Sequence, residues 1–126
     1  MLKRIKSQNG DAFYTRERCF ITELLNHADS PGLSIARCCV KPAVMTELHR
    51  LKATHETYLI EQGEGEMDDA NSPPIPVAAG DCVTISPGQA QRIRNIGQDD
   101  LVFQVICSPR FRPECYEPLE PDNGVS

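Results

Sequence analysis

The stretch Thr46–Met67 constrains the fold of this chain more than any other part of the sequence. It contains two short runs in which apolar and polar residues alternate, separated by a polar elbow at residues 52–55. Period two places Glu47 and His49 on one face of the first run, and Glu56 and Tyr58 on one face of the second. A histidine and a glutamate on the inward faces of adjacent strands converge on one point, as a metal ion or an acid–base pair requires.

The spacing of these residues resembles the first motif of the cupin family, Gly-x5-His-x-His-x3,4-Glu-x6-Gly. His49, Glu56 and Gly63 match that motif, and residues 80–95 resemble the second one, Gly-x5-Pro-x-Gly-x2-His-x3-Asn. In the second stretch Gly80, Gly88 and Asn95 are in register, with Pro87 one place late. Two motifs in the right order indicate the fold more strongly than either alone. The resemblance covers residues 34–109 and implies an all-β chain, a cupin-type jelly-roll β-barrel of two antiparallel sheets.

The chain also departs from the cupin motifs. Ala43 replaces the first glycine, Leu51 the second metal-binding histidine, and Gln91 the last histidine. Carried over residue by residue, the resemblance implies a metal site of His49, Glu56 and Gln91. One nitrogen and two oxygen ligands suit a divalent ion such as Zn, Fe(II) or Mn. In the alternative, Leu51 marks a lost metal site and an apolar pocket.

Two further residues are candidates for catalysis. Glu47 has the parity to face the same cavity and is a candidate general base; the alternative is a solvated charge at a strand end. Tyr58, if it points inward, is a candidate proton donor; the alternative is plain core. His55 has the opposite parity to Glu56 and is not assigned to the metal. A register that pairs Glu47 with His49 as the first ligands leaves a gap before Glu56 longer than the motif allows.

Length and charge narrow the possible partners. The 126 residues suit one domain, and we expect an N-terminal arm at 1–17, the barrel at 18–109, and a tail of irregular structure at 110–126 that wraps it. The net charge of −5 argues against nucleic acid and against an anionic membrane. No apolar run approaches the ~18 residues of a transmembrane helix. Two-fold dimers are the commonest assembly, so the extra terminal segments predict a homodimer.

Six cysteines occur without a Cys-x-x-Cys pair. Their density is low for a disulfide scaffold, so we interpret them as reduced thiols of a cytoplasmic protein.

Two classes of function remain open from the sequence. The first is a metal-dependent enzyme acting on a small organic molecule, of the dioxygenase, isomerase or cyclase type found among cupins. The second is a non-catalytic small-ligand binding or sensing module with a weak or lost metal site. The absent second histidine favours the binding module, whereas His49 and Glu56 favour the enzyme.

Overall fold

The computed structural model describes residues 1–7 and 12–121, and nearly all its regular structure is β-strand. The strands are β1 (Phe13–Tyr14), β2 (Phe20–Leu25), β3 (Ser34–Val40), β4 (His49–Leu51), β5 (His55–Gln62), β6 (Glu64–Asp68), β7 (Ile75–Ala78), β8 (Cys82–Ile85), β9 (Arg92–Asn95), β10 (Leu101–Ser108) and β11 (Tyr116–Pro118), with one 3₁₀ turn, η1 (Pro113–Cys115). No helix in the described residues is long and apolar enough to span a membrane.

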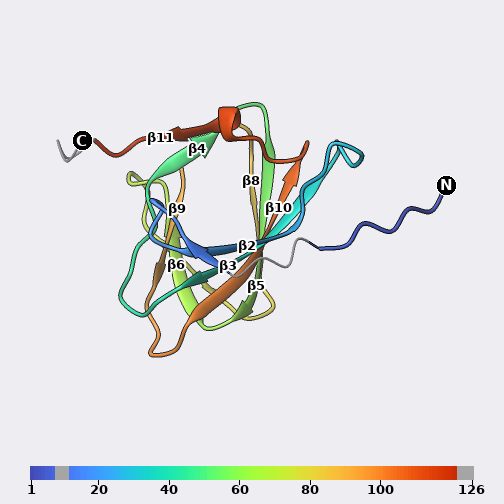
Figure 1. Cartoon of the computed structure of the whole chain (residues 1–126). Helices are drawn as coiled ribbons and strands as arrows, with labels where there is room; N and C mark the ends of the chain where they lie inside the picture. The colour runs from blue at the N-terminus through green and yellow to red at the C-terminus, as the bar shows by residue number, and fades with distance from the viewer. Residues whose placement is uncertain (8–11, 122–126) are drawn as a thin grey trace.

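The strands form two antiparallel layers that curve around one interior (Figure 1). One layer has the order β1-β2-β3-β10-β5-β8. The other combines the sheet β7-β6-β9 with the ribbon β11-β4, and the isolated bridges Met45↔Arg94 and His49↔Gln91 join these two parts. The prediction of an all-β barrel of two antiparallel sheets is therefore confirmed.

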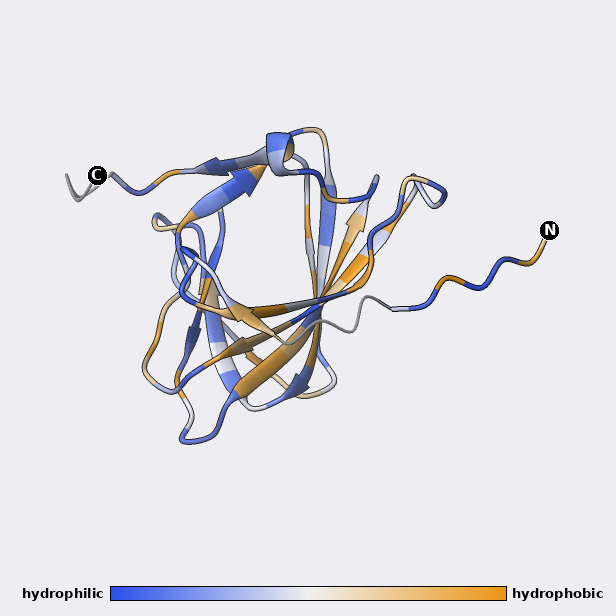
Figure 2. Cartoon of the chain, viewed as in Figure 1, coloured by the Kyte–Doolittle hydropathy of each residue, from blue (hydrophilic) through white to orange (hydrophobic). Residues whose placement is uncertain are grey.

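The hydrophobic core fills the end of the barrel where β10 begins. Every second residue along a strand points inward, and residues at these inward positions form this core. The largest fully buried apolar side chains are Phe103, Ile60, Ile93, Leu101 and Val40. Burial of one such side chain stabilises the fold by about 1.5–3 kcal/mol. Figure 2 shows hydrophobic colour along β10 and hydrophilic colour on most of β4 and β11. The two ends of the barrel therefore differ in chemistry.

Two glycines of the predicted turn after β5 have a steric role. Gly63 has a φ of 92°, and a Cβ there would lie 2.9 Å from the Asp100 carbonyl oxygen. A Cβ on Gly65 would lie 3.0 Å from the Arg94 carbonyl oxygen. Ala43, where the cupin motif has a glycine, adopts a φ of 67°, a left-handed conformation that costs alanine about 1 kcal/mol. The motif glycines thus mark backbone geometry and carry no site chemistry.

The C-terminal segment is more regular than the sequence predicts. The prediction of irregular structure throughout 110–126 is wrong for η1 and for β11, which pairs with β4 from Tyr116↔Leu51 to Pro118↔His49. The prolines suggest a break, but Pro118 and His49 are opposite each other without a hydrogen bond between them, so the missing N–H of Pro118 costs the ladder nothing. At the other terminus, β1 of the expected arm pairs with β2. Residues 122–126 of the expected tail lie outside the described residues.

Candidate functional site

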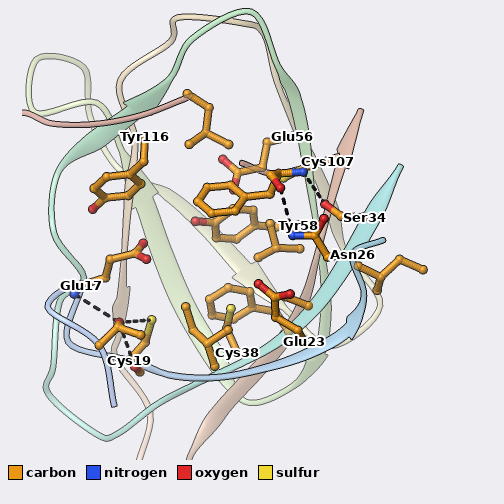
Figure 3. Close-up of a pocket in the computed structure, with 18 of the residues that line it drawn as sticks. Glu17, Cys19, Glu23, Asn26, Ser34, Cys38, Glu56, Tyr58, Cys107 and Tyr116 are labelled. Carbon is orange, nitrogen blue, oxygen red and sulfur yellow. Dashed lines mark hydrogen bonds between the residues drawn. The ribbon is translucent and has the colours of Figure 1, made fainter. Parts of the chain in front are cut away.

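A cavity of about 200 Å³ lies inside the barrel at the end that carries β4 and β11. Side chains from β2, β3, β4, β5 and β10 line it, together with Phe111 and Tyr116 of the C-terminal segment. Figure 3 shows Glu17, Glu23 and Glu56 reaching it from different sides of the barrel. An engineered cavity of about 150 Å³ admits benzene, so this one is large enough for a molecule of about one ring.

His49 is held by backbone and side-chain contacts at the cavity wall. Its backbone exchanges two hydrogen bonds with Gln91, at 3.1 and 2.9 Å, which fixes the two residues opposite each other. The His49 Nδ1 lies 2.7 Å from the Glu47 carbonyl oxygen, which can only accept, so Nδ1 carries the proton. Burial lowers the pKa of His49 and keeps the ring neutral. The Nε2 atom is therefore a hydrogen-bond acceptor.

The Gln91 side chain connects the other members of the site. Its amide nitrogen donates to His49 Nε2 at 2.8 Å and to Glu56 Oε1 at 2.7 Å. The tautomer of His49 requires a donor at this place, which sets the orientation of the amide. Its oxygen accepts from the Tyr58 hydroxyl at 3.0 Å. The sequence prediction that His49, Glu56 and Gln91 point to one place agrees with this arrangement, and Tyr58 joins them.

Glu56 is a buried carboxyl with a single protein partner among the described residues. Burial, and next the charge of Glu17, raise its pKa from 4.5 to about 8. Near neutral pH Glu56 is therefore mostly protonated. Because Oε1 accepts from Gln91, the proton belongs on Oε2, which has no hydrogen-bond partner in the described part of the chain. Glu56 thus has an O–H available to a molecule in the cavity.

Glu17 is a second carboxyl of the cavity, and the sequence reasoning placed it in the N-terminal arm. Burial, and next the charge of Glu47, raise its pKa from 4.5 to about 7. Residues 17, 19, 21, 23 and 25 all line the cavity. Alternation along β2 could have identified Glu23 from the sequence, whereas Glu17 lies upstream of β2, before Arg18, whose φ of 68° interrupts the alternation.

Glu47 is buried but is not among the side chains that line the cavity. Its carboxylate accepts from the Tyr116 hydroxyl at 2.6 Å and from Arg16 at 3.3 Å. The Tyr116 ring stacks on His49 with centroids 4.8 Å apart. Glu47 therefore holds Tyr116 and, through its carbonyl oxygen, His49, whereas Glu17 has the position that the sequence suggested for a base.

The donor atoms of this site, as arranged, do not fit a divalent metal ion. A cation bound by His49 needs the lone pair of Nε2, which accepts an N–H of Gln91, and the Gln91 oxygen is occupied by the Tyr58 hydroxyl. Leu51 is buried beside them and offers no donor atom. Among the described residues, no group of three His, Cys, Asp or Glu side chains is arranged to hold a metal.

Comparison with known proteins identifies the family that the chain matches. Residues 36–107 match the family described as cupin domain, which covers more than half of the chain. An oxalate-binding protein of Thermotoga maritima is 34% identical over 71 residues, which are 56% of this chain and 58% of the relative. The match thus spans little more than half the length of that relative.

Solved structures share the fold over more of the chain. A predicted oxalate decarboxylase from Thermotoga maritima is 28% identical, with a TM-score of 0.66 over 72% of this chain and 80% of that one. A polyketide cyclase from Streptomyces resistomycificus has a TM-score of 0.77 at 16% identity, covering 98% and 89% of the two chains. A nucleoside dehydratase has a TM-score of 0.76 at 15% identity, covering 94% and 92%.

Proposed function

The chain belongs to the cupin family, and we propose that it is an enzyme that moves protons on a small molecule bound in the barrel cavity, without a metal ion. The reaction class is elimination of water or isomerisation next to a carbonyl group. Glu56 serves as the general acid and Glu17 as the general base. The cyclase and the dehydratase share only the fold with this chain, so the proposal rests on the site residues.

The observation that carries the proposal is the presence of two carboxyls with raised pKa values on one cavity. Glu56, with a pKa of about 8, holds a proton near neutral pH, and Glu17, with a pKa of about 7, is divided between its two forms. A catalytic acid or base works best when its pKa lies near the operating pH. Both carboxyls change protonation near neutral pH, and we assign the acid role to Glu56 because its free Oε2 carries the proton into the cavity.

In an elimination, one of these two groups takes up a proton and the other gives one up. The Glu17 carboxylate takes a proton from the carbon next to a carbonyl, and the electron pair of that C–H bond forms the new C=C bond. The bond to the β-hydroxyl breaks, and the proton on Glu56 Oε2 goes to the departing oxygen, which leaves as water. Glu17 is then protonated and Glu56 ionised, and exchange with solvent restores the starting forms.

The remaining polar residues hold Glu56 in place. Gln91 donates to Glu56 Oε1, and its own orientation is fixed by His49 and Tyr58. Because Glu56 Oε1 accepts the N–H of Gln91, the acidic proton of Glu56 lies on Oε2. Tyr58 has a pKa raised well above its usual value, mainly by burial, so it stays a hydroxyl donor to Gln91. These three are positioning residues in this reaction.

A cyclic β-hydroxy ketone tests the proposal. Chelator-treated protein is incubated with 3-hydroxycyclohexanone in D₂O, and the cyclohexenone product and deuterium uptake are followed by NMR. We expect turnover that falls by about 100-fold in Glu56→Gln and in Glu17→Gln, in the range of a lost acid or base. Glu64→Gln, an exposed carboxyl on β6, is the charge-matched control and should keep the rate. Turnover or exchange no faster than in buffer would favour a binding module instead.

The metal-dependent alternative predicts a different result in the same assay. His49 and Glu56 stand at two family metal positions, so a rate that appears only on addition of Zn, Fe(II) or Mn would contradict the proposal. Leu51→His restores an imidazole beside His49 and should give the variant a measurable metal content, whereas wild type should hold less than one ion per ten chains. Elemental analysis of protein purified without an affinity tag checks both values.

A further inference from the structure

The ionisable side chains that line the cavity are unusual in their charge. Glu17, Glu23 and Glu56 are acidic and His49 is neutral, and among the described lining residues none is lysine or arginine. The nearest arginines are engaged elsewhere: Arg16 pairs with Glu47, Arg18 with Glu120, and Arg110 donates to Asn26. Because Glu56 is mostly protonated near neutral pH, Glu23 and the ionised fraction of Glu17 give the cavity its negative charge.

Two of these acids have no partner of their own. In the described part of the chain, the carboxylates of Glu17 and Glu23 accept no hydrogen bond and form no ion pair, although both line the cavity. Several acids on the outside of the barrel are paired, among them Glu61 with Arg37, Asp68 with Arg92, and Glu117 with Arg50. A partly buried carboxylate without a counter-charge is costly, so an inward pair of this kind points to a ligand that supplies the charge.

Aromatic rings contribute to the remaining wall beside aliphatic and small side chains. Tyr58 stacks on Phe103 with ring centroids 4.7 Å apart, and Tyr116 stacks on His49. Phe111, whose carbonyl oxygen accepts from the Asn26 side chain, adds another ring to the wall. The faces of such rings attract organic cations, and combinations of rings with carboxylates recognise ammonium groups in other proteins.

We propose that the ligand of this cavity is a small organic cation, an ammonium or amidinium group on an apolar body of about one ring, with Glu23 and Glu17 as its counter-charges. The cation is the substrate class for the site of the proposed function. Binding of the cation does not depend on that function; only the statement that it is a substrate rests on it. A dianion such as oxalate would meet two unpaired carboxylates and no cationic side chain.

A cation in this place also changes the state of Glu17. A nearby positive charge favours the ionised form of a carboxyl and lowers its pKa. Glu17 faces Glu47, Arg16, Glu56 and Tyr116, and of these only Arg16 is positively charged. A bound cation would therefore convert Glu17 into the carboxylate that the base role requires. Substrate binding and activation of the base are then one event.

Three probes of nearly equal shape separate the charge classes. Binding of benzylamine, which is protonated at pH 7, is compared with that of benzyl alcohol and benzoate by calorimetry or ligand-observed NMR. We expect benzylamine to bind about tenfold more tightly than benzyl alcohol, and benzoate to bind more weakly than either. Equal affinities for the three probes, or a preference for benzoate, would overturn the proposal.

Variants connect the selectivity to named side chains. Glu23→Gln should lose about tenfold in benzylamine affinity and keep its affinity for benzyl alcohol, while the control Glu64→Gln changes neither. If Glu23→Gln weakens the alcohol equally, Glu23 acts on the shape of the cavity and the proposal fails. Glu56→Gln removes the proposed acid but should retain the preference for the cation. Loss of turnover with retained selectivity, or the reverse, thus separates failure of this inference from failure of the proposed function.

Discussion

The two ends of the barrel both bury polar side chains, but they satisfy them differently. At the end with the hydrophobic core, Asn95 is 1% exposed and uses both ends of its amide. It donates to the carbonyl oxygens of Val40 and Asp99 at 2.9 and 2.8 Å, and accepts from the Gly97 N–H at 2.9 Å. At the cavity end, Glu56 is 6% exposed, and only one of its oxygens has a partner in the described chain.

This difference between Asn95 on β9 and Glu56 on β5 separates structural from functional polar groups. Gln91 directly precedes β9 and Asn95 ends it; both belong to the second family motif, and both use their whole amide within the protein. A fully hydrogen-bonded group such as Asn95 fixes a loop and offers nothing to a ligand. A buried carboxyl with a free oxygen destabilises the fold, and such a cost is typical of a site that acts on a ligand.

The largest expected effect is at the satisfied end. Asn95→Ala leaves the buried Val40 carbonyl oxygen without its donor and opens a small cavity. We expect a loss of about 4 kcal/mol in the free energy of unfolding. Urea denaturation measures it, and Asn71→Ala in the exposed loop after β6 is the control, with a change under about 0.5 kcal/mol. A loss below about 1 kcal/mol in Asn95→Ala would remove the contrast between the two ends.

At the cavity end, by contrast, we expect a substitution that removes a cost in folding free energy at higher pH. The pKa of Glu56 is higher in the folded state, about 8, than the 4.5 of an ordinary carboxyl. The folded state therefore binds more protons, and stability is full below about pH 4.5 and falls as the pH rises towards 8. In Glu56→Gln this fall between pH 5 and 8 should be smaller by about 3 kcal/mol. Denaturation curves at four pH values, with Glu64→Gln as control, provide the measurement; parallel curves for Glu56→Gln and wild type would contradict it.

A smaller effect is expected at Tyr116, which closes the cavity from β11. Tyr116→Phe keeps the ring on His49 and removes the hydroxyl that donates to Glu47 Oε1. Because Arg16 still binds the other oxygen of Glu47, we expect a loss of about 1 kcal/mol. Thermal unfolding compares it with Tyr14→Phe, whose ring is exposed on β1. Equal stabilities of the two variants would show that this contact does not hold the C-terminal segment.

The sequence predicted those parts of the site that lie on regular alternation. His49, Glu56 and Gln91 come from strand positions with clear parity or from the motif spacing, and the structure brings them together. Tyr58, for which the sequence left a proton donor and plain core as alternatives, is buried and donates to Gln91, and its part in catalysis stays a prediction. The homodimer and the cytoplasmic location stay predictions.

The sequence could not predict the contacts that join distant parts of the chain. Glu17 reaches the cavity through a turn in which Arg18 has a φ of 68°, which interrupts the alternation before β2. Tyr116 lies in a proline-rich segment, and its pairing with β4 spans most of the chain. The use of Gln91 as a double donor depends on the tautomer of His49, which is set by the Glu47 carbonyl oxygen at 2.7 Å. None of these leaves a local pattern.

The titration of the Glu56 carboxyl by ¹³C NMR tests the central claim most directly. Labelled glutamate carboxyls are followed from pH 3 to 10, and the Glu56 resonance is assigned by its absence in Glu56→Gln. The account predicts a midpoint near pH 8 that falls in Glu17→Gln, because the charge of Glu17 contributes to the raised pKa. A midpoint near the ordinary 4.5 would leave no acid in the cavity at neutral pH and would contradict the account.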